Sequence, residues 1–302
     1  MPWLQLKARI APEHAERLEE LLLAEGATAI TLQDAFDDPV FEPERGTTPL
    51  WDETLLSGLY DDLEGIDAML DRVRQAWAVE FPQEPCPEVE VELLADRDWE
   101  REWMVDFQPL RMGEWLWIVP SWHAPPAPDA VNLLLDPGLA FGTGTHPTTA
   151  LCLAWLDSLA VAGELQDRAV LDVGCGSGIL AIAALKLGAR HATATDIDPQ
   201  ALQASRDNAE RNGVTEADLR LGYPEQLEAG NFALVVANIL AGPLVAMAEE
   251  IAGRLAPGGR LALSGILEGQ AEEVRRAYRD QGLVMDEPTT REGWVLLPGR
   301  RP

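Results

Sequence analysis

The chain has 302 residues, of which 47% are hydrophobic, enough for one large domain or two ordinary ones. Its 51 acidic residues outnumber 23 Lys and Arg and give a formal net charge of −28. Because a polyanion would be repelled, this charge argues against free DNA or RNA as a direct partner and favours a basic protein. Plain solubility and adaptation to a salty cytoplasm are alternative explanations of the same charge.

Signals for membranes, secretion and metals are missing from the sequence. No run of about 18 apolar residues predicts a membrane span, and the N-terminus lacks the pattern of a secretion signal. The three cysteines, Cys86, Cys152 and Cys175, are too scattered for a disulfide framework or a zinc site, and the four histidines have no metal-ligand spacing. We therefore predict a cytoplasmic protein with reduced thiols, no metal and no membrane contact.

The first 95 residues are predicted to form a small α+β domain. Alternating apolar residues predict strands, and apolar residues at helical spacing predict helices. The predicted strands are Trp3–Ile10, Ala29–Gln33, Trp51–Tyr60 and Val89–Leu94, and the predicted helices are Pro12–Glu25 and Ile66–Val79. The order βαββαβ is that of a ferredoxin-like unit. Because no catalytic constellation falls within it, a scaffold or recognition role is expected.

Residues 96–130 are predicted to connect two domains. A short aromatic-rich helix is expected over 98–107, and strand-like pieces around Leu110 and 115–119. Four prolines interrupt the stretch that follows, and the tryptophans predict that the connector is packed.

From residue 131 to 302, strands and helices alternate, which predicts a doubly wound α/β sheet. Strands are expected at 133–135, 169–173, 191–195, 219–221, 232–237 and 260–264, and helices at 148–159, 179–185, 200–211, 244–255 and 270–281. A turn is expected at 257–259, and an antiparallel hairpin of 283–286 with 294–297 at the sheet edge. Ligands of such sheets bind beyond the carboxyl ends of the strands.

The segment DVGCGSG at 172–178 predicts a glycine turn between a buried strand and an apolar helix. Glycine permits positive φ and close approach of a ligand, and the helix N-terminus offers free N–H groups. The spacing GxGxG differs from the GxGxxG fingerprint of dinucleotide folds. Asp196, at the tip of the next strand, can accept both hydroxyls of a ribose, as acids also do in NAD-binding proteins. A methyltransferase and an NAD-dependent oxidoreductase both remain possible at this point.

Asn238 follows the predicted strand 232–237 and is the candidate catalytic residue. Methyl transfer from a sulfonium is an in-line displacement, so the acceptor nitrogen must present its lone pair to the methyl group. A side-chain carbonyl can accept the amine N–H bonds and aim that lone pair. A neutral amide also favours the ammonium form less than a carboxylate does. The structural alternative is that Asn238 only caps the following helix.

The glycine-rich segment 138–149 is a second candidate. Its hydroxyls and glycines predict a hydrogen-bonding lid that opens a helix at Thr148 or Thr149. His146 within it is expected to be structural rather than a general base, because water can take the proton that the reaction releases.

Four long motifs resemble the PrmA family of bacterial methyltransferases, which act on protein eleven of the large ribosomal subunit. They are DPGLAFGTGTHPTT (136–149), VLDVGCGSGILAIAALKLGA (170–189), DIDPQALQASRDNAERNGV (196–214) and VANILAGPL (236–244). The resemblance implies a class I, Rossmann-like fold and S-adenosylmethionine-dependent trimethylation of the N-terminal α-amine and lysine ε-amines of that protein. It also implies that the N-terminal domain docks the substrate while the linker lets the catalytic domain reorient.

Carried over to this chain, the cofactor contacts implied by the resemblance fall on Thr149, Gly174, Gly176, Asp196 and Asn238, with Phe141 over the cofactor or the target. The alternatives are a methyltransferase for another protein, small-molecule or nucleic-acid nitrogen, and an NAD-binding oxidoreductase. The negative charge opposes nucleic acid, and the glycine spacing together with Asn238 opposes NAD. A monomer is expected.

Overall fold

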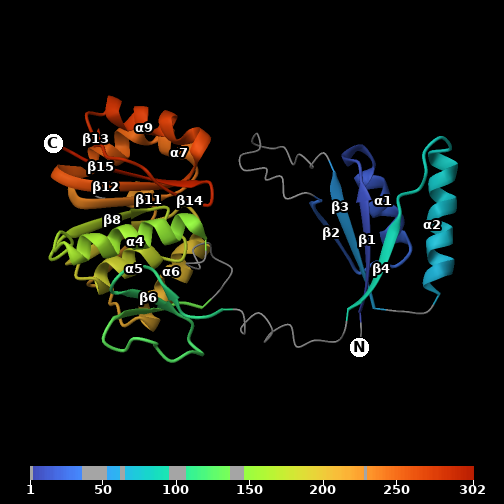
Figure 1. Ribbon diagram of the computed structural model, residues 1–302, viewed down its shortest axis with the longest axis horizontal. Coiled ribbons are helices and arrows are strands. Elements are labelled where there is room, and N and C mark those ends of the chain that lie inside the picture. Colours follow the sequence, from blue (N-terminus) through green and yellow to red (C-terminus); the bar gives the residue numbers. More distant parts are fainter. Residues whose placement is uncertain (1–2, 36–52, 62–64, 95–106, 137–145, 228–229) are drawn as a thin grey trace. The chain divides into compact units, whose positions relative to one another are not determined.

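The computed structural model describes residues 3–35, 53–61, 65–94, 107–136, 146–227 and 230–302 (Figure 1). The chain divides into two compact units, Met1–Asp106 and Phe107–Pro302. The division falls inside the predicted connector 96–130, because residues from Phe107 onward already belong to the second unit. The predicted helix over 98–107 lies, apart from Phe107, outside the described residues.

The described residues of the first unit form a four-stranded sheet and two helices. In chain order its elements are β1 (Trp3–Ile10), α1 (Pro12–Ala24), β2 (Ala29–Asp34), β3 (Thr54–Tyr60), α2 (Ile66–Glu80) and β4 (Val89–Leu94). The strand order is β2-β3-β1-β4, and every neighbouring pair is antiparallel. Alternate residues of β1, among them Leu4 and Leu6, are buried in one core with Leu18 of α1 and Trp77 of α2, as the period of a half-buried strand requires.

The second unit is built on an eight-stranded mixed sheet with the order β10-β9-β8-β11-β12-β15-β13, and β14 pairs with β15. Five strands are parallel: β8 (Ala169–Val173), β9 (His191–Thr195), β10 (Leu219–Gly222), β11 (Phe232–Asn238) and β12 (Leu255–Leu267). Three are antiparallel: β13 (Val284–Met285), β14 (Thr289–Arg291) and β15 (Trp294–Arg300).

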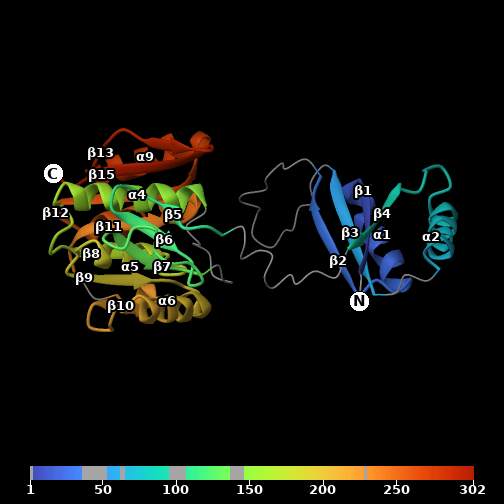
Figure 2. The ribbon, with the colours of Figure 1, turned by 60° about the horizontal axis from the view of Figure 1, so that its bottom comes forward.

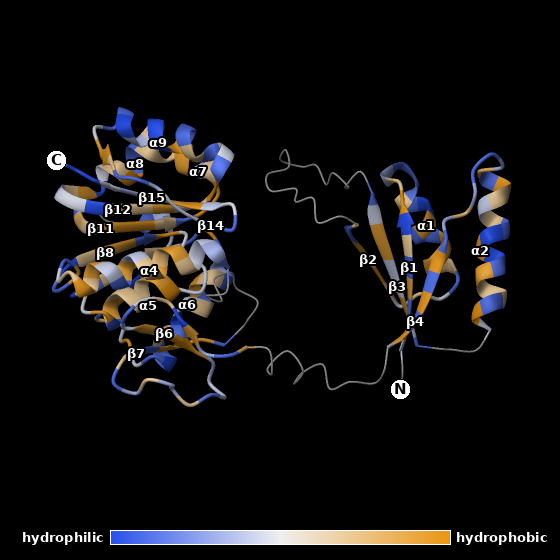
Figure 3. Ribbon diagram, viewed as in Figure 1, coloured by the Kyte–Doolittle hydropathy of each residue, from blue (hydrophilic) through white to orange (hydrophobic). Residues whose placement is uncertain are grey.

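Helices cover both faces of this sheet and bury a hydrophobic core on each. One core includes α4 (Pro147–Val161), α5 (Ile179–Lys186) and α6 (Pro199–Arg211), and the other includes α7 (Ala241–Ala246), α8 (Ala248–Gly253) and α9 (Ala271–Asp280). Within β8, Val170 faces the first core and Leu171 the second. Strands buried on both faces are mostly hydrophobic, as Figure 3 shows for β8 and β11, and the exceptions, Asp172 in β8 and Asn238 at the end of β11, stand out for that reason.

A small sheet of β5 (Leu110–Arg111), β6 (Leu116–Val119) and β7 (Val131–Leu134) packs on α4 and α5 (Figure 2). The predicted strand at 133–135 thus pairs with β6 and not with the large sheet. The carboxylate of Asp157, buried in α4, accepts backbone N–H bonds from Glu114 at 2.6 Å and from Trp115 and Leu116 at 2.9 Å each. These bonds anchor the turn between β5 and β6 to the helix.

The C-terminal elements differ in detail from the predictions. The predicted helix 244–255 is two helices, α7 and α8, with Met247 between them. The predicted turn 257–259 lies within β12, where the pairing with β11 shifts register. The strand β14 was not predicted, because its three residues are all exposed and show no apolar alternation. Two short 3-10 helices, Pro224–Gln226 and Glu268–Gln270, complete the unit.

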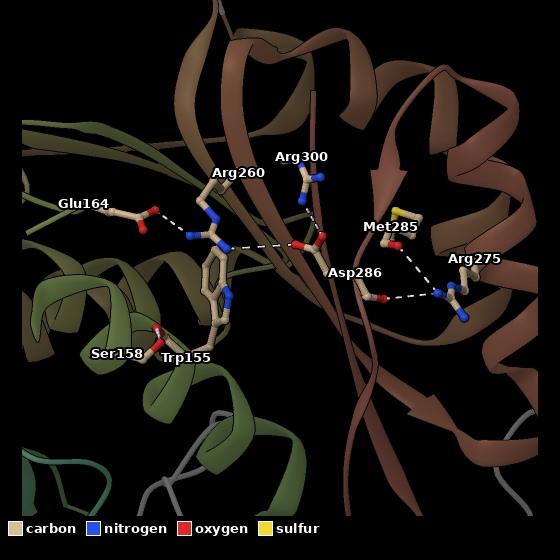
Figure 4. A network of polar contacts seen from close by, with 8 residues as sticks. All are labelled: Trp155, Ser158, Glu164, Arg260, Arg275, Met285, Asp286 and Arg300. Carbon is tan, nitrogen blue, oxygen red and sulfur yellow. Dashed lines mark hydrogen bonds and ion pairs between the residues drawn. The ribbon is translucent and has the colours of Figure 1, made fainter. Parts of the chain in front are cut away.

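Charged side chains fasten the antiparallel strands to the rest of the sheet (Figure 4). Arg260 of β12 forms ion pairs with Glu164, which follows α4, and with Asp286, which follows β13. Asp286 also accepts a 2.6 Å hydrogen bond from Arg300 of β15. Arg260 pairs with Leu234 near the start of the parallel pairing between β11 and β12, so these charged groups lie away from the carboxyl ends of the parallel strands. Among the described helices, none has the length and apolar character to cross a membrane.

Candidate cofactor and substrate site

The turn between β8 and α5 depends on its glycines. Gly174, Gly176 and Gly178 have φ values of +72°, +53° and +76°, a region that L-residues with a Cβ rarely adopt. A Cβ on Gly174 would also lie 2.3 Å from Cγ2 of Ile239, in the segment after β11. Gly174 is therefore required by both backbone conformation and close packing between two strand ends.

Hydrogen bonds join this turn to the end of β9. The N–H groups of Gly174 and Cys175 both donate to the carbonyl of Thr195, at 2.8 and 3.0 Å. The Gly176 N–H donates to Oδ2 of Asp196 at 2.9 Å, and the Asp198 N–H donates to Oδ1 at 3.0 Å. Since each carboxylate oxygen can accept two hydrogen bonds, Asp196 retains acceptor capacity on both oxygens for the hydroxyls of a ligand.

Asn238 is the last residue of β11, and its side chain reaches α4. Its Nδ2 donates to Oγ1 of the buried Thr149 at 3.3 Å. Its Oδ1 is buried and has no hydrogen-bond partner among the described residues. A buried acceptor without a donor is unfavourable by about 1–3 kcal/mol, so this oxygen has the character of a site for an incoming N–H group. The capping alternative is not supported, because α7 has Leu240 as its N-cap and no side-chain cap bond.

A buried carboxyl group that the sequence analysis did not single out belongs to β8, the strand that leads into the glycine turn. Asp172 of β8 accepts from the Ala181 N–H at 3.1 Å through Oδ2, while its Oδ1 has no partner in the described part of the chain. Burial raises the pKa of Asp172 to about 7. An acid inside the otherwise apolar strand AVLDV was the available signal for this group.

The strand order β9-β8-β11 brings Asp196, Gly174 and Asn238 to the carboxyl ends of three adjacent parallel strands. Thr149 joins them through its bond with Asn238, and Gly176 through its bond with Asp196. A cavity of about 170 Å³, lined in part by Thr195 of β9 and by Gly222 and Gln226, lies beside β10 next to Asp196. Phe141 and most of the predicted lid, 137–145, fall outside the described residues.

The family model described as "Ribosomal protein L11 methyltransferase (PrmA)" matches residues 2–302. The chain belongs to the PrmA family. The "Ribosomal protein L11 methyltransferase" of Chromohalobacter salexigens is 72% identical over 302 residues, which cover all of both chains. The protein of the same name from Pseudomonas aeruginosa is 56% identical over 301 residues, covering 100% of this chain and 99% of the relative.

A solved structure agrees with this PrmA assignment. The crystal structure of "ribosomal protein L11 methylase" from Lactobacillus delbrueckii subsp. bulgaricus is 33% identical, with a TM-score of 0.57, and covers 65% of this chain and 100% of its own. The second unit accordingly has the α/β methyltransferase fold with a mixed sheet, and the chain is a methyltransferase. The NAD-dependent oxidoreductase alternative is thereby removed.

Proposed function

We propose that this PrmA-family chain transfers methyl groups from S-adenosylmethionine to the N-terminal α-amine and the lysine ε-amines of ribosomal protein L11. The observation that carries the proposal is the buried Oδ1 of Asn238, which has no hydrogen-bond partner among the described residues and lies at a strand end adjacent to the glycine turn. The names of the relatives support L11 as the substrate. A net charge of −28 favours a basic protein partner over nucleic acid.

The residues at the three strand ends fit S-adenosylmethionine, whose sulfonium supplies the methyl group. Gly174 and Gly176 would let the cofactor approach the backbone closely. The free lone pairs of Asp196 would accept the ribose hydroxyls, and the adjacent cavity would receive the base. Thr149 and Asn238 would border the methionine portion, on the other side of the glycine turn.

Asn238 would act on the acceptor amine. A free lysine amine has a pKa of about 10.4, so it must lose a proton before it can attack. The Oδ1 atom would accept an N–H of the neutral amine and direct its lone pair at the methyl carbon. The new N–C bond then forms as the C–S bond breaks, the bonding electrons remain on sulfur, and water takes the proton released by the amine. An amide suits this role because it does not stabilise the ammonium form as a carboxylate does.

The proposal extends to the domain organisation. The strand order β2-β3-β1-β4 and the two helices support a ferredoxin-like recognition domain over residues 1–95. Residues 96–130 would form the connector, and 131–302 the methyltransferase domain with an antiparallel C-terminal hairpin. Its support is that β13, within the predicted 283–286, and β14 both pair antiparallel with β15. We further propose a monomer that acts in the cytoplasm without binding nucleic acid.

The direct test is incubation of the purified chain with unmethylated L11 and S-adenosylmethionine, followed by intact-mass and peptide analysis. We expect L11 to gain whole multiples of one methyl mass, at its N-terminus and at lysines. A mixture of the other dissociated ribosomal proteins is the control and should gain none. Transfer to a different protein, or to none, would refute L11 as the substrate.

Replacement of Asp196 by asparagine tests the proposed ribose contact. We expect S-adenosylhomocysteine to bind about 10-fold more weakly, because a neutral acceptor replaces a charge-assisted one. Isothermal titration calorimetry measures the change. Asp198→Asn is the matched control, since Asp198 caps α6 by accepting from the Gln200 N–H and asparagine caps equally well. Equal affinities of Asp196→Asn and wild type would remove Asp196 from the cofactor site.

A further inference from the structure

His146 occupies the junction between α4 and the strand β15. It is the N-cap residue of α4, and its side chain accepts a 3.4 Å hydrogen bond from the Thr148 N–H. Its Nδ1 also lies 2.7 Å from Oγ1 of Thr148. On the other side, the imidazole meets the indole of Trp294 edge to face, with ring centroids 5.0 Å apart.

The N-cap hydrogen bond requires a neutral imidazole, because the ring must offer a nitrogen that can accept. In the tautomer that carries the ring proton on Nε2, Nδ1 accepts from the Thr148 N–H, and the Thr148 hydroxyl donates in the 2.7 Å contact. An imidazolium has no acceptor atom, and its charge would face the positive end of the helix dipole. The cap therefore exists only with neutral His146.

The surroundings keep His146 neutral at physiological pH. Burial lowers the pKa of His146, while Glu292, in the turn between β14 and β15, raises it by a smaller amount. The cap is complete above the ordinary histidine pKa of about 6.5 and is lost as the pH falls through the lowered value.

The capped turn is the one that carries the partner of Asn238. Thr149 lies three residues after His146, and its Oγ1 accepts the Asn238 Nδ2–H bond. Fraying of this turn would displace Thr149 and leave Asn238 without the contact that orients its amide. The path from Trp294 through His146 to Thr149 and Asn238 thus joins β15, α4 and β11.

We propose that neutral His146 is a positioning residue for methyl transfer, which caps α4 and thereby holds Thr149 as the partner of the Asn238 side chain. The inference rests on the proposed role of Asn238 in aiming the amine. His146 itself touches neither cofactor nor amine in this role, and it takes no proton from the substrate.

The test compares the pH dependence of kcat/KM for wild type, His146→Ala and His146→Asn. When only the substrate amine becomes protonated as the pH falls, a plot of log(kcat/KM) against pH has a slope of about one. When a second group, here His146, must also be neutral, the slope rises to about two at low pH. We expect this steepening in wild type below the His146 pKa. Asparagine accepts the cap bond without titrating, so His146→Asn should keep the shallow slope and most of the rate at pH 8.

His146→Ala should lower kcat roughly fivefold at pH 8, the factor that corresponds to a lost cap of ~1 kcal/mol. Its far-ultraviolet circular dichroism spectrum should match that of wild type, which reports a folded chain. Equal steepening in wild type and His146→Asn, or an unaltered kcat in His146→Ala, would overturn the proposal. Asp172 titrates in all three chains, so the difference between their profiles isolates His146.

Hydrogen exchange separates this inference from the function itself. Protection of the Thr148 amide should fall in wild type as the pH is lowered from neutral through the lowered His146 pKa, and it should remain in His146→Asn over the same range, with no substrate present. If Thr148 behaves so while Asn238→Ala retains full turnover, the cap is right and the role of Asn238 is wrong. If protection is the same in both chains over this range, the cap is not controlled by His146 and the inference fails.

Discussion

Asn238→Ala is expected to lower kcat for L11 methylation by about 10²–10³, the range measured when one preorganised polar group is removed from an active site. The reason is that Oδ1 is buried, lacks a partner among the described residues and, in the function proposed above, accepts an N–H of the amine. The dissociation constant of S-adenosylhomocysteine should change much less than kcat. Single-turnover kinetics together with calorimetry measure the two quantities separately.

Asn231→Ala is the matched control for this variant. Asn231 precedes the opposite end of β11 and is exposed, so its loss should leave kcat at the wild-type value. A second variant, Asn238→Asp, should shift the activity profile to higher pH, because a carboxylate stabilises the ammonium form and raises the pKa of the amine. Equal kcat in wild type and Asn238→Ala would remove this side chain from the mechanism.

Gly174→Ala is expected to lower the free energy of unfolding by about 2–5 kcal/mol and to abolish measurable cofactor binding. Two effects add at this position. Alanine is strained at a φ of +72°, and its Cβ would lie 2.3 Å from Cγ2 of Ile239, a β-branched side chain that has little freedom to rotate. Relief of the contact would separate the ends of β8 and β11 and displace the glycine turn. Urea denaturation and calorimetry measure both losses.

Gly213→Ala distinguishes the two effects. Gly213 has a similar φ of +68°, but a Cβ there would meet nothing within 4 Å. This control should therefore show the backbone strain alone, about 1–2 kcal/mol, with cofactor binding retained. Gly174→Ala combined with Ile239→Ala should recover part of the lost stability. If Gly174→Ala is no worse than Gly213→Ala, the close approach to Ile239 has no energetic importance.

Local patterns were sufficient to predict most elements and the chemistry at their ends. Apolar residues alternate with a period of two in Trp3–Ile10 and recur at helical spacing in Ile66–Val79, and both patterns involve only residues that are close in sequence. Both elements occur in the structure at or within one residue of the predicted bounds. The glycine turn at 174–178 was predictable because positive φ is a local requirement. The placement of Asp196 and Asn238 at strand ends followed from the rule that parallel strands share one carboxyl edge.

Contacts between distant segments were beyond such patterns. Thr149 and Asn238 are separated by 89 positions, and no local periodicity indicates that their side chains meet. No local periodicity indicates the ring contact between His146 and Trp294 either. Local periodicity also gives no sign of the hydrogen bonds that Asp157 accepts from three backbone N–H groups. The pairing of β6 with β7 was also beyond these patterns, because prolines and short apolar runs in residues 107–130 conceal it.

The amino-acid sequence alone thus determined the alternation of elements, the glycine turn and the candidate acids and amide, since these follow from backbone preference and residue chemistry. Only the tertiary structure decided that the Asn238 side chain donates to Thr149 while its carbonyl oxygen has no partner in the described ranges, and that His146 caps the helix which carries Thr149. The physical reason is that hydrogen-bond satisfaction and burial depend on which side chains the packed sheet and helices bring within 3–4 Å, whatever their separation along the chain.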